Sequence, residues 1–140
     1  MQYRQQGDFK LSEIGLGCYS LSGVYGKKDP QAFKAVVRCA FDLGVNFFDT
    51  AEAYGNAEQV LGQAVRPFRQ QVYIATKVGV KEGVKPNLTE AYIRSACDQS
   101  LAMLGSDTID LYQVHFDDPE TPVAETVSAL EGLKKAGKIR

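Results

Sequence analysis

Four side chains of different ionisable types stand where short apolar segments of this sequence end. Such segments are typical of buried strands, and the carboxyl ends of parallel strands lie on one face of a fold and converge at the mouth of a barrel. We therefore expect the four side chains to meet in one catalytic site. They are Asp49, Tyr54, Lys77 and His115.

Together these side chains suit the donation of a proton to a carbonyl oxygen. The phenol of a free tyrosine titrates near pH 10, so an acid that works near neutrality needs a positive charge beside it. An ammonium about 4 Å from a phenol, at an effective dielectric constant near 20, contributes about 4 kcal/mol. An imidazole on the other side can orient the carbonyl by a hydrogen bond. Because no nucleophile is required, a hydride from an external cofactor is the natural partner of this acid.

Each of these residues taken alone has an ordinary structural explanation. Asp49 could cap a turn, Tyr54 could be an aromatic residue of a surface turn, and His115 could be a buried histidine with satisfied hydrogen bonds. Lys77 is harder to explain, because a lysine that faces neighbouring strands must either be paired or have a lowered pKa. The catalytic interpretation therefore depends on the combination, in which Asp49 holds the lysine and the lysine acts on the tyrosine.

The elements that must position these residues form a regular series. Residues 3–14 contain Gly7-Asp8 between two extended runs and predict a small hairpin. Four strand–helix units of roughly 30 residues follow, which is the pattern of a parallel sheet with right-handed crossovers. The predicted strands span residues 14–21, 45–50, 72–78 and 109–115, and the predicted helices start at Asp29, Asn56, Thr89 and Thr121.

Local signals indicate where the helices begin and which sides they bury. Asp29 precedes Pro30 as an N-cap precedes a first-turn proline, and Asn56 with Gln59 forms a variant of the capping box. Apolar spacing predicts one buried face on each helix. On the first helix that face is Phe33, Val36, Val37, Ala40 and Phe41, and on the fourth it is Val123, Val127, Leu130 and Leu133.

Two architectures fit this series of elements. A doubly wound open sheet suits a chain of 140 residues, whereas a (β/α)₈ barrel typically needs about 250 residues, so four units make half of one. A doubly wound nucleotide-binding protein should carry GxGxxG after its first strand, but Ser20 stands where the third glycine is required. Length favours the open sheet, and the site residues must decide between the two.

Composition limits the class of protein. The chain has 16 Lys and Arg against 17 Asp and Glu and is 44% hydrophobic, which suits one globular domain and offers no basic surface to nucleic acid. No apolar stretch approaches the roughly 20 residues of a membrane helix. The three cysteines are widely spaced and form no metal-binding motif, so we expect reduced thiols, no metal and a cytoplasmic location.

Three motifs at the strand ends closely resemble those of the aldo-keto reductases. They are Asp-Thr-Ala-Glu-Ala-Tyr-Gly at 49–55, with Glu58 just after, Ala-Thr-Lys at 75–77, and Asp-Leu-Tyr-Gln-Val-His at 110–115. Residues 11–17 and 130–140 are also similar to that family. The resemblance implies a single domain over residues 1–140 of the parallel (β/α) barrel type. It would have about four βα units, half of a TIM barrel, with the hairpin closing the barrel bottom.

The same resemblance implies an oxidoreductase that reduces an aldehyde or ketone with NADPH. Tyr54 would be the proton donor, Lys77 and Asp49 would support it, and His115 would orient the small carbonyl substrate. The cofactor contacts that it implies are Gly17, Cys18, Tyr19 and Asp49.

The similarity stops where a fifth strand should begin, because residues 138–140 lead toward a strand that does not follow. Family members take most of their cofactor contacts from the later half. A half barrel also leaves strand edges unpaired, which predicts self-association. The alternatives are therefore a catalytically incompetent half barrel, or a regulatory or interaction module similar to the channel-associated β subunits. A flavodoxin-like carrier or receiver domain is disfavoured, because residues 14–21 hold neither an acidic cluster nor a phosphate loop.

Overall fold

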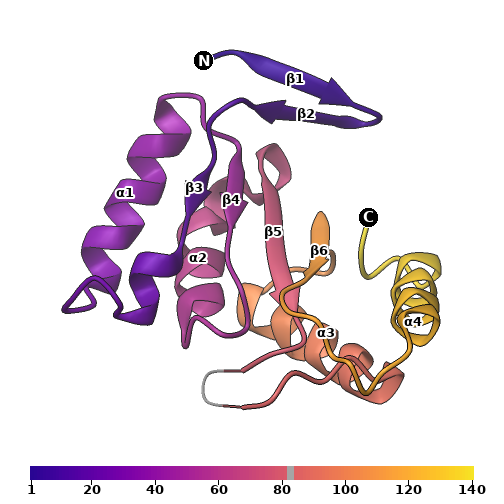
Figure 1. Ribbon diagram of the computed structural model, residues 1–140. Helices are drawn as coiled ribbons and strands as arrows, with labels where there is room; N and C mark the ends of the chain where they lie inside the picture. Colours follow the sequence, from indigo (N-terminus) through magenta and orange to yellow (C-terminus); the bar gives the residue numbers. More distant parts are fainter. Residues whose placement is uncertain (82–83) are drawn as a thin grey trace.

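An antiparallel hairpin opens the chain, as predicted. In the computed structural model, which describes residues 1–81 and 84–140, β1 (Tyr3–Gln6) pairs with β2 (Phe9–Ser12). The turn between the strands holds Gly7 at φ +56°, a conformation that glycine adopts without steric cost. Figure 1 shows the hairpin lying across the end of the sheet at which the parallel strands start.

The main sheet has four parallel strands in the order of the sequence. Its strands are β3 (Leu16–Gly17), β4 (Phe47–Asp49), β5 (Tyr73–Val78) and β6 (Leu111–Val114), in the order β3-β4-β5-β6. A doubly wound sheet reverses its strand order at a switch point, whereas a barrel adds each strand beside the one before. The observed order therefore confirms the barrel-type prediction and excludes the open sheet that length favoured.

Among the residues that the structure describes, four α-helices alternate with these strands and pack in sequence. They are α1 (Pro30–Asp42), α2 (Ala57–Val65), α3 (Glu90–Leu104) and α4 (Val123–Lys135), with short 3-10 helices η1 (Tyr19–Ser22) and η2 (Arg66–Gln71). Each α-helix contacts the next: α1 with α2, α2 with α3, and α3 with α4 (Figure 1). Residues 81–87, whose glycine, lysine and proline content predicts a loop, include 82 and 83, which lie outside the described residues.

Alternation along the strands separates the core from the site. Successive side chains of a strand point to opposite faces of the sheet. Phe48 and Ile74 are completely buried in the core, while their neighbours Asp49 and Tyr73 are only partly buried. The same period of two puts Lys77 on the face of Asp49, so the charged side chains avoid the helix-covered core.

Two of the four predicted helix starts have a side-chain cap. The start predicted at Thr121 does not, because α4 begins at Val123 and its N-cap residue, Pro122, makes no side-chain cap bond. The Asp29 carboxylate accepts hydrogen bonds from the backbone N–H groups of Gln31 and Ala32, and the Thr89 hydroxyl accepts one from Tyr92 N–H. The capping box predicted at Asn56 is wrong, because Asn56 makes no side-chain cap bond. Its backbone, at φ −95° and ψ 16°, departs from the extended conformation that favours such a bond.

The predicted buried faces of the first and last helices are partly wrong. Val123 and Val127 of α4 are 71% and 47% exposed, and Val36 of α1 is 48% exposed. The buried residues of α4 are Leu133, as predicted, together with Thr126 and Ala129, which the prediction did not include. Among the described elements α1 and α4 end the row of helices, so each has a helix neighbour on one side only. The apolar stripe of each of these two helices is wide enough to pack against two helices. Half of it therefore has no helix against it.

Pairing on the far side of β6 begins within the chain. Ile139 forms a parallel bridge with Ile109, with Ile109 N–H donating to Lys138 O at 3.0 Å and Arg140 N–H donating to Ile109 O at 3.1 Å. Residues 138–140, which are predicted to lead toward a fifth strand, thus take up the next position in the sheet at Ile139. None of the described helices combines the length and hydrophobicity needed to cross a membrane.

Candidate active site

The four predicted site residues meet at the carboxyl end of the parallel sheet. Asp49 is the last residue of β4, Lys77 is the penultimate residue of β5, and His115 directly follows β6. Tyr54 lies in the loop between β4 and α2. Since strands β4, β5 and β6 are adjacent and parallel, their ends bring residues from distant parts of the sequence into one place.

Asp49 and Lys77 form a partly buried ion pair. Lys77 Nζ donates to Asp49 Oδ1 at 2.5 Å and to the backbone oxygen of Thr50 at 2.8 Å. The lysine side chain is 16% exposed and the aspartate side chain 34%. This contact satisfies the requirement that a lysine among strands be paired with an acid, and it fixes the ammonium group at the floor of the site.

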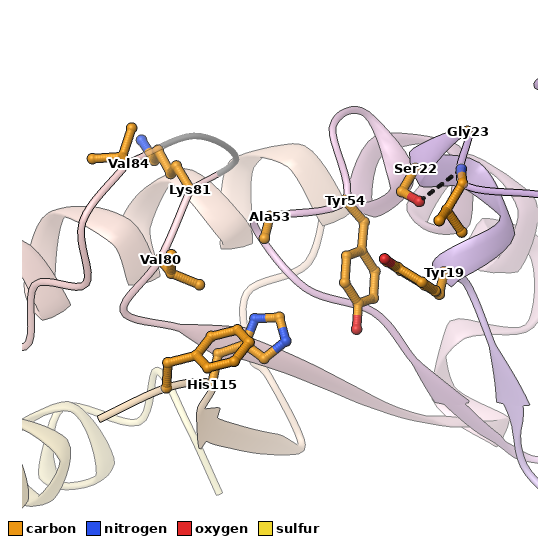
Figure 2. Close-up of a pocket in the computed structure, with 11 residues that line it drawn as sticks. Tyr19, Ser22, Gly23, Ala53, Tyr54, Val80, Lys81, Val84 and His115 are labelled. Carbon is orange, nitrogen blue, oxygen red and sulfur yellow. Dashed lines mark hydrogen bonds between the residues drawn. The ribbon is translucent and has the colours of Figure 1, made fainter. Parts of the chain in front are cut away.

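Tyr54 lies between the ammonium group and the imidazole. Lys77 Nζ is 5.2 Å from the centroid of the Tyr54 ring, within the range of a cation–π contact. The Tyr54 and His115 rings meet edge to face, with centroids 5.8 Å apart and an interplanar angle of 79°. In Figure 2 both side chains reach into the same hollow. One small polar group could thus contact the phenol and the imidazole together.

His115 is held in a state suited to hydrogen bonding. Burial lowers the pKa of the imidazole below its ordinary value, and the positive charge of Lys77 lowers it further. Its Nδ1 is buried and has no hydrogen-bond partner within the described part of the chain. Near neutral pH the ring is therefore uncharged, and it can donate one hydrogen bond to a carbonyl oxygen.

Tyr54 and His115 open onto a cavity large enough for a small molecule. Its volume is about 860 Å³, within the range of ligand sites in proteins. Loops that follow β3, β4, β5 and β6 supply its wall. The lining residues are Tyr19, Ser22, Gly23, Val24, Ala53, Tyr54, Val80, Lys81, Val84, His115 and Phe116 (Figure 2).

The residues predicted to contact a cofactor differ in which of their atoms a ligand can reach. Gly17 pairs in register with Asp49, and a Cβ added to Gly17 would meet no atom within 4 Å, so the main chain is open to a ligand. Tyr19 is 43% exposed and lines the cavity. Cys18 is completely buried, and burial, with Asp49 as a second cause, raises its pKa to about 12. Cys18 can therefore reach a ligand only through its main chain.

Two residues of the site were missed from the sequence. Gln113 Nε2 lies 3.5 Å from Asp49 Oδ2, and the strand alternation that ends at His115 could have revealed it, because the two residues are two positions apart. Glu52 Oε1 accepts hydrogen bonds from Gly79 N–H at 2.8 Å and Tyr92 O–H at 3.0 Å. These partners are 27 and 40 residues away, so no local pattern indicates them.

Glu58, which belongs to the first motif, lies outside the cavity. It is 6% exposed on α2, and its Oε1 accepts a hydrogen bond from the Thr76 hydroxyl of β5 at 2.7 Å. Burial raises the pKa of this carboxyl group. Its contacts join a helix to the core side of the sheet, which is a structural role.

Comparison with solved structures supports this architecture. The aldo-keto reductase AKR11C1 of Bacillus halodurans, in its holo form, superposes on the chain with a TM-score of 0.87 at 38% sequence identity. The match covers 100% of this chain and 48% of that one. A putative aldo-keto reductase from Pseudomonas aeruginosa gives a TM-score of 0.86 at 32% identity, covering 98% of this chain and 56% of its own. The four parallel strands thus correspond to about half of a TIM barrel.

Sequence comparison gives the same result. "Probable aldo-keto reductase 1" of Glycine max is 38% identical over 142 residues, covering 94% of this chain and 40% of that protein. "Aldo-keto reductase yakc [NADP(+)]" of Schizosaccharomyces pombe is 36% identical over 146 residues, covering 98% and 43%. The chain spans less than half the length of these relatives. The model of the aldo/keto reductase family matches residues 13–140, and this chain therefore belongs to that family of oxidoreductases.

Proposed function

We propose that this chain carries the acid–base centre of an NADPH-dependent reductase of aldehydes or ketones. The observation that carries the proposal is the convergence of Tyr54, His115 and the Asp49–Lys77 ion pair at one end of the sheet. The chain matches less than half the length of these relatives, so the activity of a whole relative does not by itself establish the activity of this chain. The proposal therefore rests on the chemistry of the residues that are present.

Tyr54 acts as the proton donor in this proposal. The O–H bond of Tyr54 would break and its proton would pass to the carbonyl oxygen, which becomes the hydroxyl oxygen of the alcohol when the carbonyl group is reduced. Lys77 Nζ, 5.2 Å from the ring centroid, stabilises the negative charge left on the phenolate. Asp49 holds the ammonium in place through the 2.5 Å contact, and water then returns a proton to Tyr54.

His115 orients the substrate. Its neutral ring, 5.8 Å from the Tyr54 ring, donates a hydrogen bond to the carbonyl oxygen before the proton is transferred. A charged imidazolium would compete with Tyr54 as the acid, so the lowered pKa of His115 supports this division of roles.

The chain offers part of a nicotinamide site. The open main chain at Gly17, the exposed ring of Tyr19 and the carboxylate of Asp49 would hold the nicotinamide riboside, and Cys18 would contribute only its backbone. The chemistry that NADPH supplies there when bound is a hydride. One relative is named for NADP(+), which supports this choice of cofactor. Three free cysteines support a cytoplasmic location for the reaction.

Titration of the purified chain with NADPH, followed by nicotinamide fluorescence, tests the proposal. We expect binding by the native chain and by Tyr54→Phe, and reduction of an aldehyde by the native chain only. Tyr3→Phe, which removes a phenol from the remote hairpin, serves as the matched control and should keep both properties. Absence of binding at millimolar NADPH overturns the proposal, as does a Tyr54→Phe variant that reduces aldehydes at the native rate.

A second candidate function, an interaction module, is favoured by the open side of the molecule. Leu111 and Val114 of β6 are 44% and 41% exposed, and Val123 and Val127 of α4 are 71% and 47% exposed. We propose that this edge, together with the free edge of β3, associates with a second copy of the chain. Such a dimer would cover apolar surface without requiring any reaction.

Sedimentation equilibrium tests this association. A dimer that Val127→Lys converts to monomer supports it, with Met103→Lys, at a similarly exposed position of α3, as the matched control. A monomer at every concentration, with a cooperative thermal transition, contradicts self-association through these edges.

A further inference from the structure

Glu52 makes contacts that the proposed proton transfer does not use. It lies in the loop between β4 and α2, two residues before Tyr54, and it is partly buried. Its Oε1 accepts hydrogen bonds from the Gly79 backbone N–H at 2.8 Å and from the Tyr92 O–H at 3.0 Å. One carboxylate oxygen thus joins three parts of the chain: the loop of Tyr54, the residue after β5, and helix α3.

Glu52 itself does not line the active-site cavity. Ala53 and Tyr54, the next two residues, line it, and so does Val80, which directly follows Gly79 (Figure 2). Neither Glu52 nor Gly79 is among the described lining residues. Glu52 can therefore act on a substrate only through the residues that it holds in place.

The main chain of the loop is weakly tied to the sheet at this point. Glu52 N–H donates to Lys77 O of β5 at 3.3 Å, which is long for such a bond. Tyr54 N–H donates to Ala51 O at 3.1 Å, a bond within the loop itself. Gly55, directly after Tyr54, has a φ of +63°, so the chain turns sharply here. The short bonds of the Glu52 side chain therefore strengthen the attachment of this turn to β5.

These bonds link the segment that carries the phenol to the segment that carries the ammonium. Glu52 is two residues before Tyr54, and its partner Gly79 is two residues after Lys77. The Tyr54 ring centroid is 5.2 Å from Lys77 Nζ. A misplacement of about 1 Å in such a pair can lower a rate about 100-fold. The position of the Glu52 carboxylate is therefore important for the geometry of the site.

Glu58 provides a comparison within the same motif. Its carboxylate also accepts a hydrogen bond from β5, from the Thr76 hydroxyl at 2.7 Å. Glu58 is 6% exposed and Thr76 is completely buried, so their contact lies in the core and not at the end of the strand. A buried carboxylate with a purely structural role is thus available as a control.

We propose that Glu52 is a positioning residue, whose carboxylate holds the loop of Tyr54 against the end of β5 so that the phenol stays beside Lys77 and His115. This inference rests on the proposed function, because it assigns a role within the same site.

NMR of the contact between the Tyr54 and His115 rings tests the inference without turnover. The ring centroids are 5.8 Å apart, and His115 is the one histidine of the chain, so nuclear Overhauser effects from its ring protons identify the contact. Glu52→Ala should weaken these effects about threefold or more. It should also lower kcat for aldehyde reduction about tenfold or more, with the aldehyde KM changed by less than about twofold.

Three further variants separate positioning from stability. Glu52→Gln keeps a carbonyl oxygen that can accept both hydrogen bonds, so it should retain the ring contact and kcat within about twofold. Tyr92→Phe removes one of the two donors and should weaken both about twofold, and it decides the question if Glu52→Ala does not fold. Glu58→Ala, the matched control, should lower the melting temperature but leave the ring contact and kcat unchanged in the folded chain.

The outcomes separate this inference from the proposed function. Loss of the ring contact in Glu52→Ala and its retention in Glu52→Gln, in a chain that reduces no aldehyde, support the inference and contradict the proposed activity. Aldehyde reduction by Glu52→Ala at the native rate, with the ring contact intact, supports the activity and overturns the inference. Equal losses in Glu52→Ala and Glu52→Gln, or in Glu52→Ala and Glu58→Ala, also overturn it.

Discussion

Charged side chains lie at both ends of the parallel sheet, but their burial and their hydrogen-bond partners differ. At the amino end, Asp110 is 5% exposed and accepts hydrogen bonds from Arg69 at 2.8 Å, Arg140 at 2.8 Å and the Ile74 backbone N–H at 3.0 Å. At the carboxyl end, the aspartate of the Asp49–Lys77 pair is 34% exposed, and the buried Nδ1 of His115 lacks a partner among the described residues.

This difference separates charge that stabilises the fold from charge that is available for chemistry. Every contact of Asp110 joins elements of the chain: η2, the start of β5 and the residues after α4. The carboxyl end instead leaves the rings of Tyr54 and His115 facing a cavity of about 860 Å³. Barrels of this type generally keep stability and activity at opposite ends in this way.

The largest effect on stability is expected at the amino end. Asp110→Ala removes a buried carboxylate and leaves the partly buried guanidinium of Arg69 without its acid, so the free energy of unfolding should fall by about 3–5 kcal/mol. Urea denaturation followed by circular dichroism measures this. Asp42→Ala, which removes an exposed pair with Arg38 one turn away on α1, is the control and should cost about 0.5 kcal/mol or less. A loss below about 1 kcal/mol for Asp110→Ala would remove the distinction between the two ends.

A smaller loss of stability is expected at the carboxyl end. Asp49→Asn keeps the size of the side chain but leaves Lys77 without a negative partner. Since Asp49 is 34% exposed, solvent screens the charge, and we expect a loss of about 1–2 kcal/mol in the same denaturation experiment. A loss equal to that of Asp110→Ala would show that this pair is as structural as the one at the amino end.

Tyr54→Phe should leave stability within about 0.5 kcal/mol of the native chain. The variant keeps the ring that faces Lys77 Nζ at 5.2 Å and removes only the hydroxyl. Aldehyde reduction should nevertheless fall by about 100-fold or more, because the proton donor is lost. Thermal denaturation together with NADPH oxidation measures both quantities. A stability loss as large as that of Asp49→Asn would instead assign Tyr54 a structural role.

The smallest effect concerns the titration of His115, which is the one histidine of the chain. Its imidazole NMR signals should titrate below pH 6.5, and Lys77→Met should raise this pKa because it removes a nearby positive charge. Asp49→Asn should lower it further. The same direction for both variants would contradict the electrostatic explanation.

The lowered pKa also gives stability a dependence on pH. The folded state binds the His115 proton less readily than the unfolded state does. Its contribution to stability is therefore complete above the unfolded value of 6.5 and is lost as the pH falls below it, toward the folded pKa.

Short-range features of the fold could be predicted from the sequence. The hairpin, the Asp29 and Thr89 caps and the strand-end positions of the site residues depend on residues only a few positions apart. The capping box at Asn56 failed because its backbone conformation is not set by the residue types alone. The prediction of the buried faces of α1 and α4 was partly wrong, because the apolar residues of a helix do not indicate on how many sides another helix packs against it.

Sequence alone thus determined the residue types of the site and the repeated strand–helix units that carry them, because periodicity and capping act within a few turns. Only the tertiary structure decided that the strands follow the order β3-β4-β5-β6, that Gln113 lies near Asp49 across 64 positions, and that Glu52 binds Gly79 and Tyr92. These contacts depend on which strand edges pair and how the sheet brings their ends together. Local pattern cannot specify that, because each strand has two edges and many compatible partners.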